Sequence, residues 1–372
     1  MRTACLTLLP ALGLCAAAQA EVYNVGWVLA NEPHATVAYQ PNFSTTYNSA
    51  GGEVRVTPIS TGYFEVQFGR LFNGVGTSDV QVTAYETTGY CVSSGWSSTG
   101  TAVDAWVRCF DAHGNPANTQ FLLLYQDRVG HFGDSSHGLA FVWADQPTST
   151  SYTPSTGYQF NSQGAANTIV RNSTGNYTVD IPSLDFVHSD VQITAYGTIA
   201  ARCKVSGWGP NGTISRSIRR GEIGTSIGVL CFDNEGKAAD EQFDLAYAAN
   251  EPFGLTIPLD SPGAWVWANH PGPIDPNVPA TEYQYNGYGD GHVYEMNLGS
   301  TGSYQIDVPP FDDPHPANIF FSSTVLVTAY GTDSSYCNTG GWFPIIVKCY
   351  KQGGAGINTE FDAALQTTGF LK

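Results

Sequence analysis

Charged side chains are scarce in this sequence, and basic ones are the scarcest. Asp, Glu, Lys and Arg make up 13% of its 372 residues, and 15 basic residues face 32 acidic ones, giving a formal charge of −17. A surface with this balance repels phosphate backbones. The composition therefore argues against a nucleic-acid partner.

Long apolar runs are also missing beyond the first 20 residues, which argues against a membrane span. Those first residues carry Arg2, a mostly apolar stretch from Leu6 to Ala18, and the small-x-small site Ala18-Gln19-Ala20. This pattern predicts a secretory signal peptide over residues 1–20, with a mature chain that begins at Glu21. We therefore expect a secreted protein, either extracellular or on the cell surface.

The usual catalytic and cofactor motifs are absent. The sequence has no G-x-S-x-G, no H-E-x-x-H, no Walker loop and no C-x-x-C. No histidine recurs at one position of the repeated pattern described below, and His113, His188, His270 and His315 each belong to one copy. We therefore expect neither an enzyme nor a cofactor. A hydrolase whose site is assembled from distant segments of one divergent copy remains an alternative.

Two groups of residues resemble metal ligands. His131, Asp134 and His137 fall within a short Gly- and Ser-rich stretch, and Asp111 and Asp233 each open a loop that faintly resembles a calcium loop. We interpret the first as an exposed linker. The other two lack the later bidentate acid that calcium needs, which favours tight turns between strands.

What the sequence does have is one pattern in three copies. "VTAYETTGYCVSSGW" begins at Val82, "ITAYGTIAARCKVSGW" at Ile193 and "VTAYGTDSSYCNTGGW" at Val327. Matching stretches before and after them define segment 1 (21–127), segment 2 (138–249) and segment 3 (263–372). Each segment is near the common size of a domain, so each can hold its own core.

Cysteines follow the same pattern. The chain has eight, and removing Cys5 and Cys15 with the signal peptide leaves 8 − 2 = 6, two in each segment. Because each pair occupies the same two strands of its own copy, and because export favours oxidation, we predict one disulfide per segment. The predicted pairs are Cys91–Cys109, Cys203–Cys231 and Cys337–Cys349.

Alternation of apolar and polar residues predicts strands throughout. Val80, Val82 and Ala84 share one face of a strand, and Gln81 and Thr83 lie on the other. Short strands with turns every eight to twelve residues are typical of β-sandwiches and small barrels. We predict an all-β protein of three tandem β-sandwich (or small barrel) domains. Each should have seven or eight strands, of which the last four form an antiparallel meander.

Aromatic residues recur with the copies and are the candidate ligand-binding residues. By alternation they lie on the strand face opposite the cysteines, where a platform could stack on sugar rings. Two other interpretations stay open: a core position in a two-sheet fold, and a bulge near Gly95 that reverses the alternation. The set is Tyr85, Trp96, Tyr196, Trp208, Tyr330 and Trp342.

The copies resemble a repeat module of secreted bacterial proteins. The matching residues are "VWADQPT" at Val142, "ITAYG" at Ile193 and "CFDNEG" at Cys231, while segment 1 departs with Leu29 in place of the strand tryptophan and segment 3 with Lys351 in the turn. The resemblance implies no activity. We expect a non-catalytic protein of structural or adhesive type, with glycans or an extracellular protein as partner. A carbohydrate-binding protein that uses the aromatic faces is the alternative.

Overall fold

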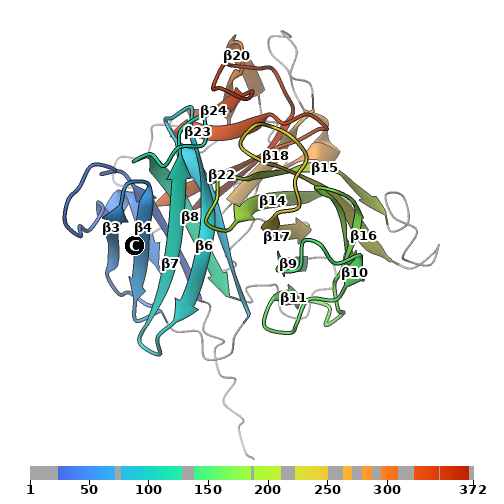
Figure 1. The fold of residues 1–372 in the computed structure, drawn as a ribbon, viewed down its shortest axis with the longest axis horizontal. Coiled ribbons are helices and arrows are strands. Elements are labelled where there is room, and N and C mark those ends of the chain that lie inside the picture. The colour runs from blue at the N-terminus through green and yellow to red at the C-terminus, as the bar shows by residue number, and fades with distance from the viewer. Residues whose placement is uncertain are drawn as a thin grey trace, which may run out of the picture.

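A computed structural model describes residues 24–71, 77–127, 138–185, 188–210, 223–249, 263–269, 279–286, 295–308, 322–342 and 344–367 (Figure 1). These residues form an all-β protein with two three-residue 3-10 helices, η1 (Phe43–Thr45) and η2 (Thr281–Tyr283). Within them, no helix is long and apolar enough to cross a membrane. The predicted signal peptide and the candidate ligands His131, Asp134 and His137 lie outside the described residues.

The strands follow the three segments in order. Segment 1 contributes β1 (Asn24–Ala30), β2 (Thr46–Asn48), β3 (Val54–Ser60), β4 (Tyr63–Gly69), β5 (Ser78–Tyr85), β6 (Tyr90–Ser98), β7 (Ala102–Phe110) and β8 (Gln120–Asp127). Segment 2 contributes β9 (Gly138–Ala144), β10 (Ser151–Tyr152), β11 (Gln159–Asn161), β12 (Thr168–Ser173), β13 (Asn176–Pro182), β14 (Ser189–Tyr196), β15 (Arg202–Pro210), β16 (Gly224–Phe232) and β17 (Gln242–Ala249). Segment 3 contributes β18 (Gly263–Ala268), β19 (Gln284–Asn286), β20 (Glu295–Ser300), β21 (Ser303–Asp307), β22 (Ser323–Ala329), β23 (Tyr336–Trp342), β24 (Ile345–Tyr350) and β25 (Phe361–Thr367).

Each segment is a sandwich of two antiparallel sheets. In segment 1 the strands β2-β1-β8-β5 form one sheet, here called the inner sheet, and β6-β7-β4-β3 form the outer sheet. Val80, Val82 and Ala84 of β5 point between them into a buried core with Phe64 and Phe121. Segments 2 and 3 have equivalent pairs of sheets and cores of their own. Segment 2 has nine strands rather than the predicted seven or eight, because β10 adds a fifth strand to its outer sheet. The predicted all-β fold and the predicted apolar face of this strand are therefore confirmed.

The three disulfides join neighbouring strands of the outer sheets. Cys91 pairs with Cys109, Cys203 with Cys231 and Cys337 with Cys349. Both cysteines of each pair are also directly opposite in the strand register. All three predicted pairings are confirmed.

The predicted meander of the last four strands is wrong. In segment 1, β5 pairs with β8, and β6 pairs with β7 in the other sheet. At its end β5 pairs with β23 of segment 3, and β6 pairs with β14 of segment 2. The chain therefore crosses from the inner to the outer sheet between Tyr85 and Tyr90.

That edge is one of three junctions through which the segments close into a ring. At each junction a backbone N–H just after a central strand donates to a carbonyl in the preceding segment's outer sheet. Gly197 N donates to Ser93 O at 2.8 Å, Gly331 N to Val205 O at 2.9 Å, and Glu86 N to Thr339 O at 2.9 Å. Segment 1 thus joins segment 2, segment 2 joins segment 3, and segment 3 returns to segment 1 (Figure 1).

The central strands β5, β14 and β22 pack against one another around the middle of the ring, which defines an approximate threefold axis. Their second faces are therefore buried as well. One level of the axis is apolar and includes Trp27, Leu139, Trp265 and Leu326. Other levels are polar, and there each threonine hydroxyl accepts a backbone N–H from a neighbouring segment. These bonds are Val82 N to Thr194 Oγ1 at 2.8 Å, Ile193 N to Thr328 Oγ1 at 2.9 Å, and Val327 N to Thr83 Oγ1 at 3.1 Å.

Candidate functional site: aromatic clusters at the segment junctions

The predicted aromatic residues meet in pairs across the three junctions. Tyr85 and Tyr196 end their central strands, Tyr330 directly follows its own, and each contacts the tryptophan of the preceding segment. Ring centroids are 6.0 Å apart for Trp96 and Tyr196, 5.7 Å for Trp208 and Tyr330, and 5.5 Å for Trp342 and Tyr85. All six side chains are half-buried. They are neither an open platform nor the core of one sandwich, but part of the contact between segments.

A bulge aims the tryptophans toward these junctions. The β6–β7 register shifts between Ser93 and Gly95, and equivalent shifts occur in β15 and β23. Gly95 has φ 143° and Gly207 has φ 157°, backbone angles that residues other than glycine rarely adopt. The bulge, one of the three interpretations left open, is thus present.

Trp96 and Trp208 are held both by core packing and by a hydrogen bond from the indole Nε1. After the bulge, each side chain packs against the core of its own segment. The indole Nε1 of Trp96 donates to Ser78 Oγ at 2.8 Å, and that of Trp208 donates to Ser189 Oγ at 3.0 Å. The rings are therefore held rigidly, with part of each left exposed.

Two further tryptophans, outside the predicted set, lie at the centre of two junctions. Trp143 of β9 lies 4.7 Å from Tyr196 and 4.4 Å from Tyr158 between ring centroids. Trp267 of β18 lies 4.9 Å from Tyr330 and 4.6 Å from Tyr283. We call the first group cluster A (Trp96, Trp143, Tyr158, Tyr196) and the second cluster B (Trp208, Trp267, Tyr283, Tyr330).

The third junction has lost half of this arrangement. Leu29, which is buried, occupies the place of Trp143 and Trp267, and Tyr85 and Trp342 remain as a pair. The indole Nε1 of Trp342 is buried without a hydrogen-bond partner, unlike the equivalent atoms of Trp96 and Trp208. The Leu29 departure is visible in the sequence, and it distinguishes this junction from the two complete clusters.

The tyrosine hydroxyls give the clusters polar groups. Burial, followed by the charges of Asp244 and Tyr158, raises the pKa of Tyr196 to about 12. Burial and the charges of Asp362, Glu360 and Tyr283 raise the pKa of Tyr330 to about 12 as well. Both phenols therefore stay protonated at neutral pH and can donate a hydrogen bond.

No family model matches the chain, and no curated protein is significantly similar to it. The chemistry of the clusters is therefore judged from their own residues. Tyr158 is 38% exposed, and the other rings of the two clusters are half-buried. Edge-on and tilted rings with protonated phenols can stack on an apolar ligand face and donate to its hydroxyls.

The loops at Asp111 and Asp233 are turns, as predicted. Asp111 Oδ1 accepts the backbone N–H groups of His113 and Asn115, and Asp233 Oδ1 accepts those of Glu235 and Lys237. Each carboxylate is therefore used by its own turn. In the described part of the chain, no group of three or more His, Cys, Asp or Glu side chains is arranged to hold a metal ion.

Proposed function

We propose that this protein is a secreted, non-catalytic adhesive protein that binds carbohydrate through clusters A and B. The observation that carries the proposal is the gathering of two tryptophans and two tyrosines, none of them fully buried, at each of two junctions. Aromatic rings suit the apolar faces of sugar rings, and phenol hydroxyls suit their rims.

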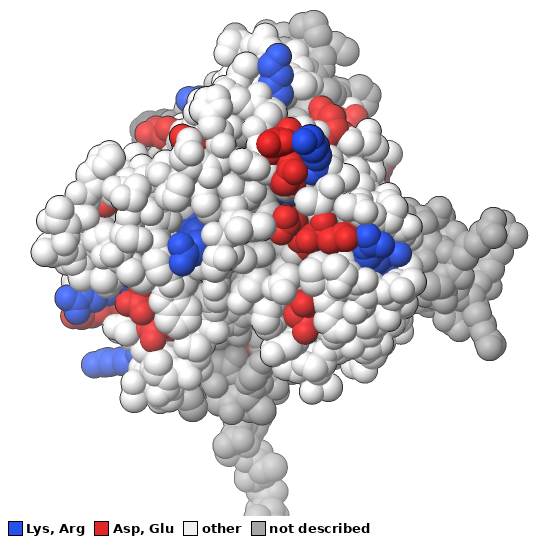
Figure 2. Space-filling model, viewed as in Figure 1, with Lys and Arg blue, Asp and Glu red and all other residues white. Residues whose placement is uncertain are grey.

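The distribution of charge supports a neutral ligand. Most of the face in Figure 2 carries neither basic nor acidic side chains, and the acidic ones gather in a few small groups. A polyanion would be repelled by the overall charge of −17, whereas a neutral glycan would not. Three structural disulfides are compatible with an extracellular location.

Two equivalent clusters on one rigid ring also suit adhesion. Two weak sites that engage one polymer or one surface gain by effective concentration, without any new contact. The ring fixes the spacing of the clusters, because the segments share sheets at their junctions. No observation in the described residues favours the hydrolase alternative.

The test replaces Trp143 and Trp267 with leucine, the residue that segment 1 has at the equivalent position, Leu29. We expect the double variant Trp143→Leu/Trp267→Leu to lose binding to neutral glycans at least about tenfold on a glycan array, because each cluster loses its central ring. The single variant Trp208→Ala should weaken binding through cluster B alone. The substitution Tyr85→Leu, at the incomplete junction, is the matched control and should leave binding unchanged.

Circular dichroism and the melting temperature of every variant would establish that the ring is intact. Equal glycan binding by the wild type and the double variant would show that the clusters only pack the junctions. The same conclusion would follow if no glycan bound the wild type.

A further inference from the structure

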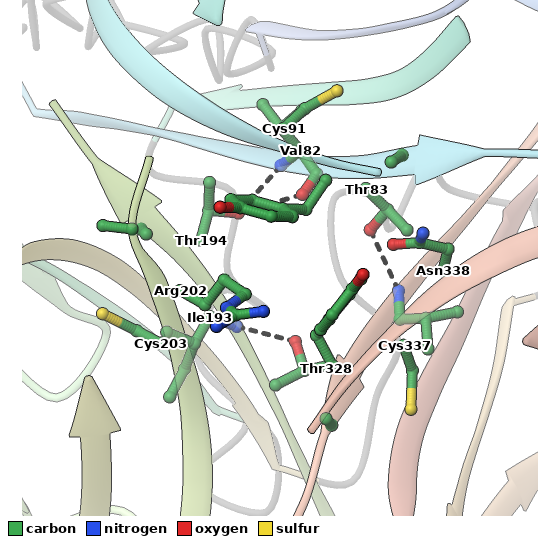
Figure 3. Close-up of a pocket in the computed structure, with 17 residues that line it drawn as sticks. Val82, Thr83, Cys91, Ile193, Thr194, Arg202, Cys203, Thr328, Cys337 and Asn338 are labelled. Atoms are coloured by element: carbon green, nitrogen blue, oxygen red, sulfur yellow. Dashed lines mark hydrogen bonds between the residues drawn. The ribbon is translucent and has the colours of Figure 1, made fainter. Parts of the chain in front are cut away.

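A small, partly open cavity lies on the threefold axis, apart from the aromatic clusters. Its volume is about 50 Å³, and it is lined by equivalent residues of all three segments. Val82, Ile193 and Val327 line one level, and Tyr90, Arg202 and Tyr336 line another. Figure 3 shows strands of the three segments around this space, with Arg202 pointing into it. A few water molecules or one small anion would fill it.

Arg202 breaks the threefold pattern of this cavity. The sequence reads Tyr-Cys at Tyr90 and Tyr336 but Arg-Cys at Arg202. The guanidinium carbon lies 5.1 Å from the ring centroid of Tyr90 and 5.0 Å from that of Tyr336. The side chain therefore crosses the axis between two aromatic rings, and the whole residue is 5% exposed.

Part of the guanidinium has no partner. Nη2 donates to the carbonyl of Asp233 at 3.1 Å and to Gln352 Oε1 at 2.6 Å. Nε and Nη1 are buried and have no hydrogen-bond partner, and neither has the hydroxyl of Tyr90. Three donor atoms of two residues that line the cavity are thus unsatisfied, which is costly unless something in the cavity accepts from them.

Among the described residues Arg202 has no ion-pair partner, and its charge is offset only in part by the rings of Tyr90 and Tyr336 and by the charge of Asp233. Burial lowers its pKa, yet a guanidinium stays protonated in proteins. The nearby Lys204 is paired with Asp333 at 2.9 Å, and the carboxylate of Asp233 caps its own turn. Buried charges in proteins are normally paired, so a single negative charge is missing here.

We propose that the axial cavity binds one small monovalent anion, of halide or short-carboxylate size, which accepts hydrogen bonds from Nε and Nη1 of Arg202 and from the Tyr90 hydroxyl. One negative charge neutralises the charge of Arg202, and a cavity of about 50 Å³ suits a small anion. The bound anion links the three segments at the axis. It therefore stabilises the closed ring, independently of any glycan at the clusters.

The test compares the melting temperature in bromide with that in gluconate at equal ionic strength. Bromide is the probe, and gluconate, which is too large for the cavity, is the reference. We expect bromide to raise the melting temperature of the wild type by about 2 °C or more relative to gluconate. The variant Arg202→Tyr, which gives all three segments the same residue, should lose this difference. Lys237→Gln removes an exposed cation and should keep it.

Crystals of the wild type grown in bromide supply a measurement that does not depend on the variant folding. We expect an anomalous bromide peak within hydrogen-bond distance of Arg202 Nε or Nη1. Crystals whose cavity holds no such peak would overturn the proposal, as would an equal bromide response in the wild type and Arg202→Tyr.

Discussion

The free energy of unfolding should fall as the pH rises from about 4.5 to 8, because four buried aspartates favour their protonated form. Burial raises the pKa of Asp79 to about 6, against weaker opposing hydrogen bonds from Gln81 and Gln126. Burial and the charge of Asp79 raise the pKa of Asp244, and the Ser93 hydroxyl opposes the rise. The charge of Asp79 in segment 1 thus acts on Asp244 in segment 2.

A second pair repeats this arrangement between segments 2 and 3. Burial raises the pKa of Asp190, whose carboxylate accepts hydrogen bonds only from Gln192 and its own strand. Burial, Asp190 and Glu360 raise the pKa of Asp362, and neither oxygen of Asp362 accepts a hydrogen bond. The third junction has Thr324 and Leu122 at the two equivalent positions and so holds no such pair.

The direction of the effect follows from proton binding. Each of these acids has a folded pKa above its unfolded value near 3.8, so between the two values the folded state binds more protons than the unfolded state. The free energy of unfolding then falls by about 1.4 kcal/mol per pH unit for each titrating carboxyl. Asp240, whose pKa is lowered by Arg171, has the opposite effect and acts at more acidic pH.

The substitution Asp362→Asn isolates this contribution, since asparagine resembles the neutral acid. At pH 8 we expect it to raise the free energy of unfolding by about 1–3 kcal/mol, and at pH 4.5 to change it by less than about 0.5 kcal/mol. Chemical denaturation at both pH values measures this difference. Asp240→Asn, which breaks a surface pair with Arg171 at 2.7 Å, should destabilise at pH 8. A wild type that becomes more stable between pH 4.5 and 8 would contradict this account.

Removing segment 3 should abolish cooperative folding of the rest. A chain of residues 21–262 would leave the edge of β5 without β23 and expose the axial residues Trp27 and Leu139, which now contact Trp265 and Leu326. An open edge and an exposed apolar face favour aggregation. We expect no cooperative thermal transition at the temperature of the full chain, together with strong binding of a hydrophobic dye.

The matched control is the full chain with a protease site placed between segments 2 and 3. After cleavage the same residues are present in two pieces, and we expect them to remain associated and to melt cooperatively. If the truncated chain melted as the full chain does, the shared sheets and the axial contacts would contribute little to stability.

The sequence predicts what is local to one copy. Alternation places Val80, Val82 and Ala84 in the core correctly. The recurrence of two cysteines at the same positions of each copy assigns the disulfide pairs. It does not predict where the opposite face of the same strand goes. Gln81 and Thr83 have the polarity of a solvated face, but they bond with Thr194 and with the backbone of Val327 on the axis. Those partners lie over a hundred residues away, in copies that look alike.

The candidate site shows the same limit. Alternation places Tyr85 and Trp96 on the face opposite the cysteines, but it does not show that each pairs with a residue of another segment. Trp143 and Trp267 were recognisable only as repeated residues of an opening strand. The sequence shows that Arg202 replaces the tyrosine that precedes the cysteine in the other two copies. It does not show that Arg202 lies on the threefold axis against Tyr90 of another segment.

Ring closure also limits how this gene could have grown. In an open tandem array, a further copy adds to the end and leaves the others undisturbed. Here the last segment returns to the first through Glu86 and Thr339, so every junction is already occupied. A fourth copy would have no free edge to join in this ring, and a chain of only two copies would leave one of its three positions empty.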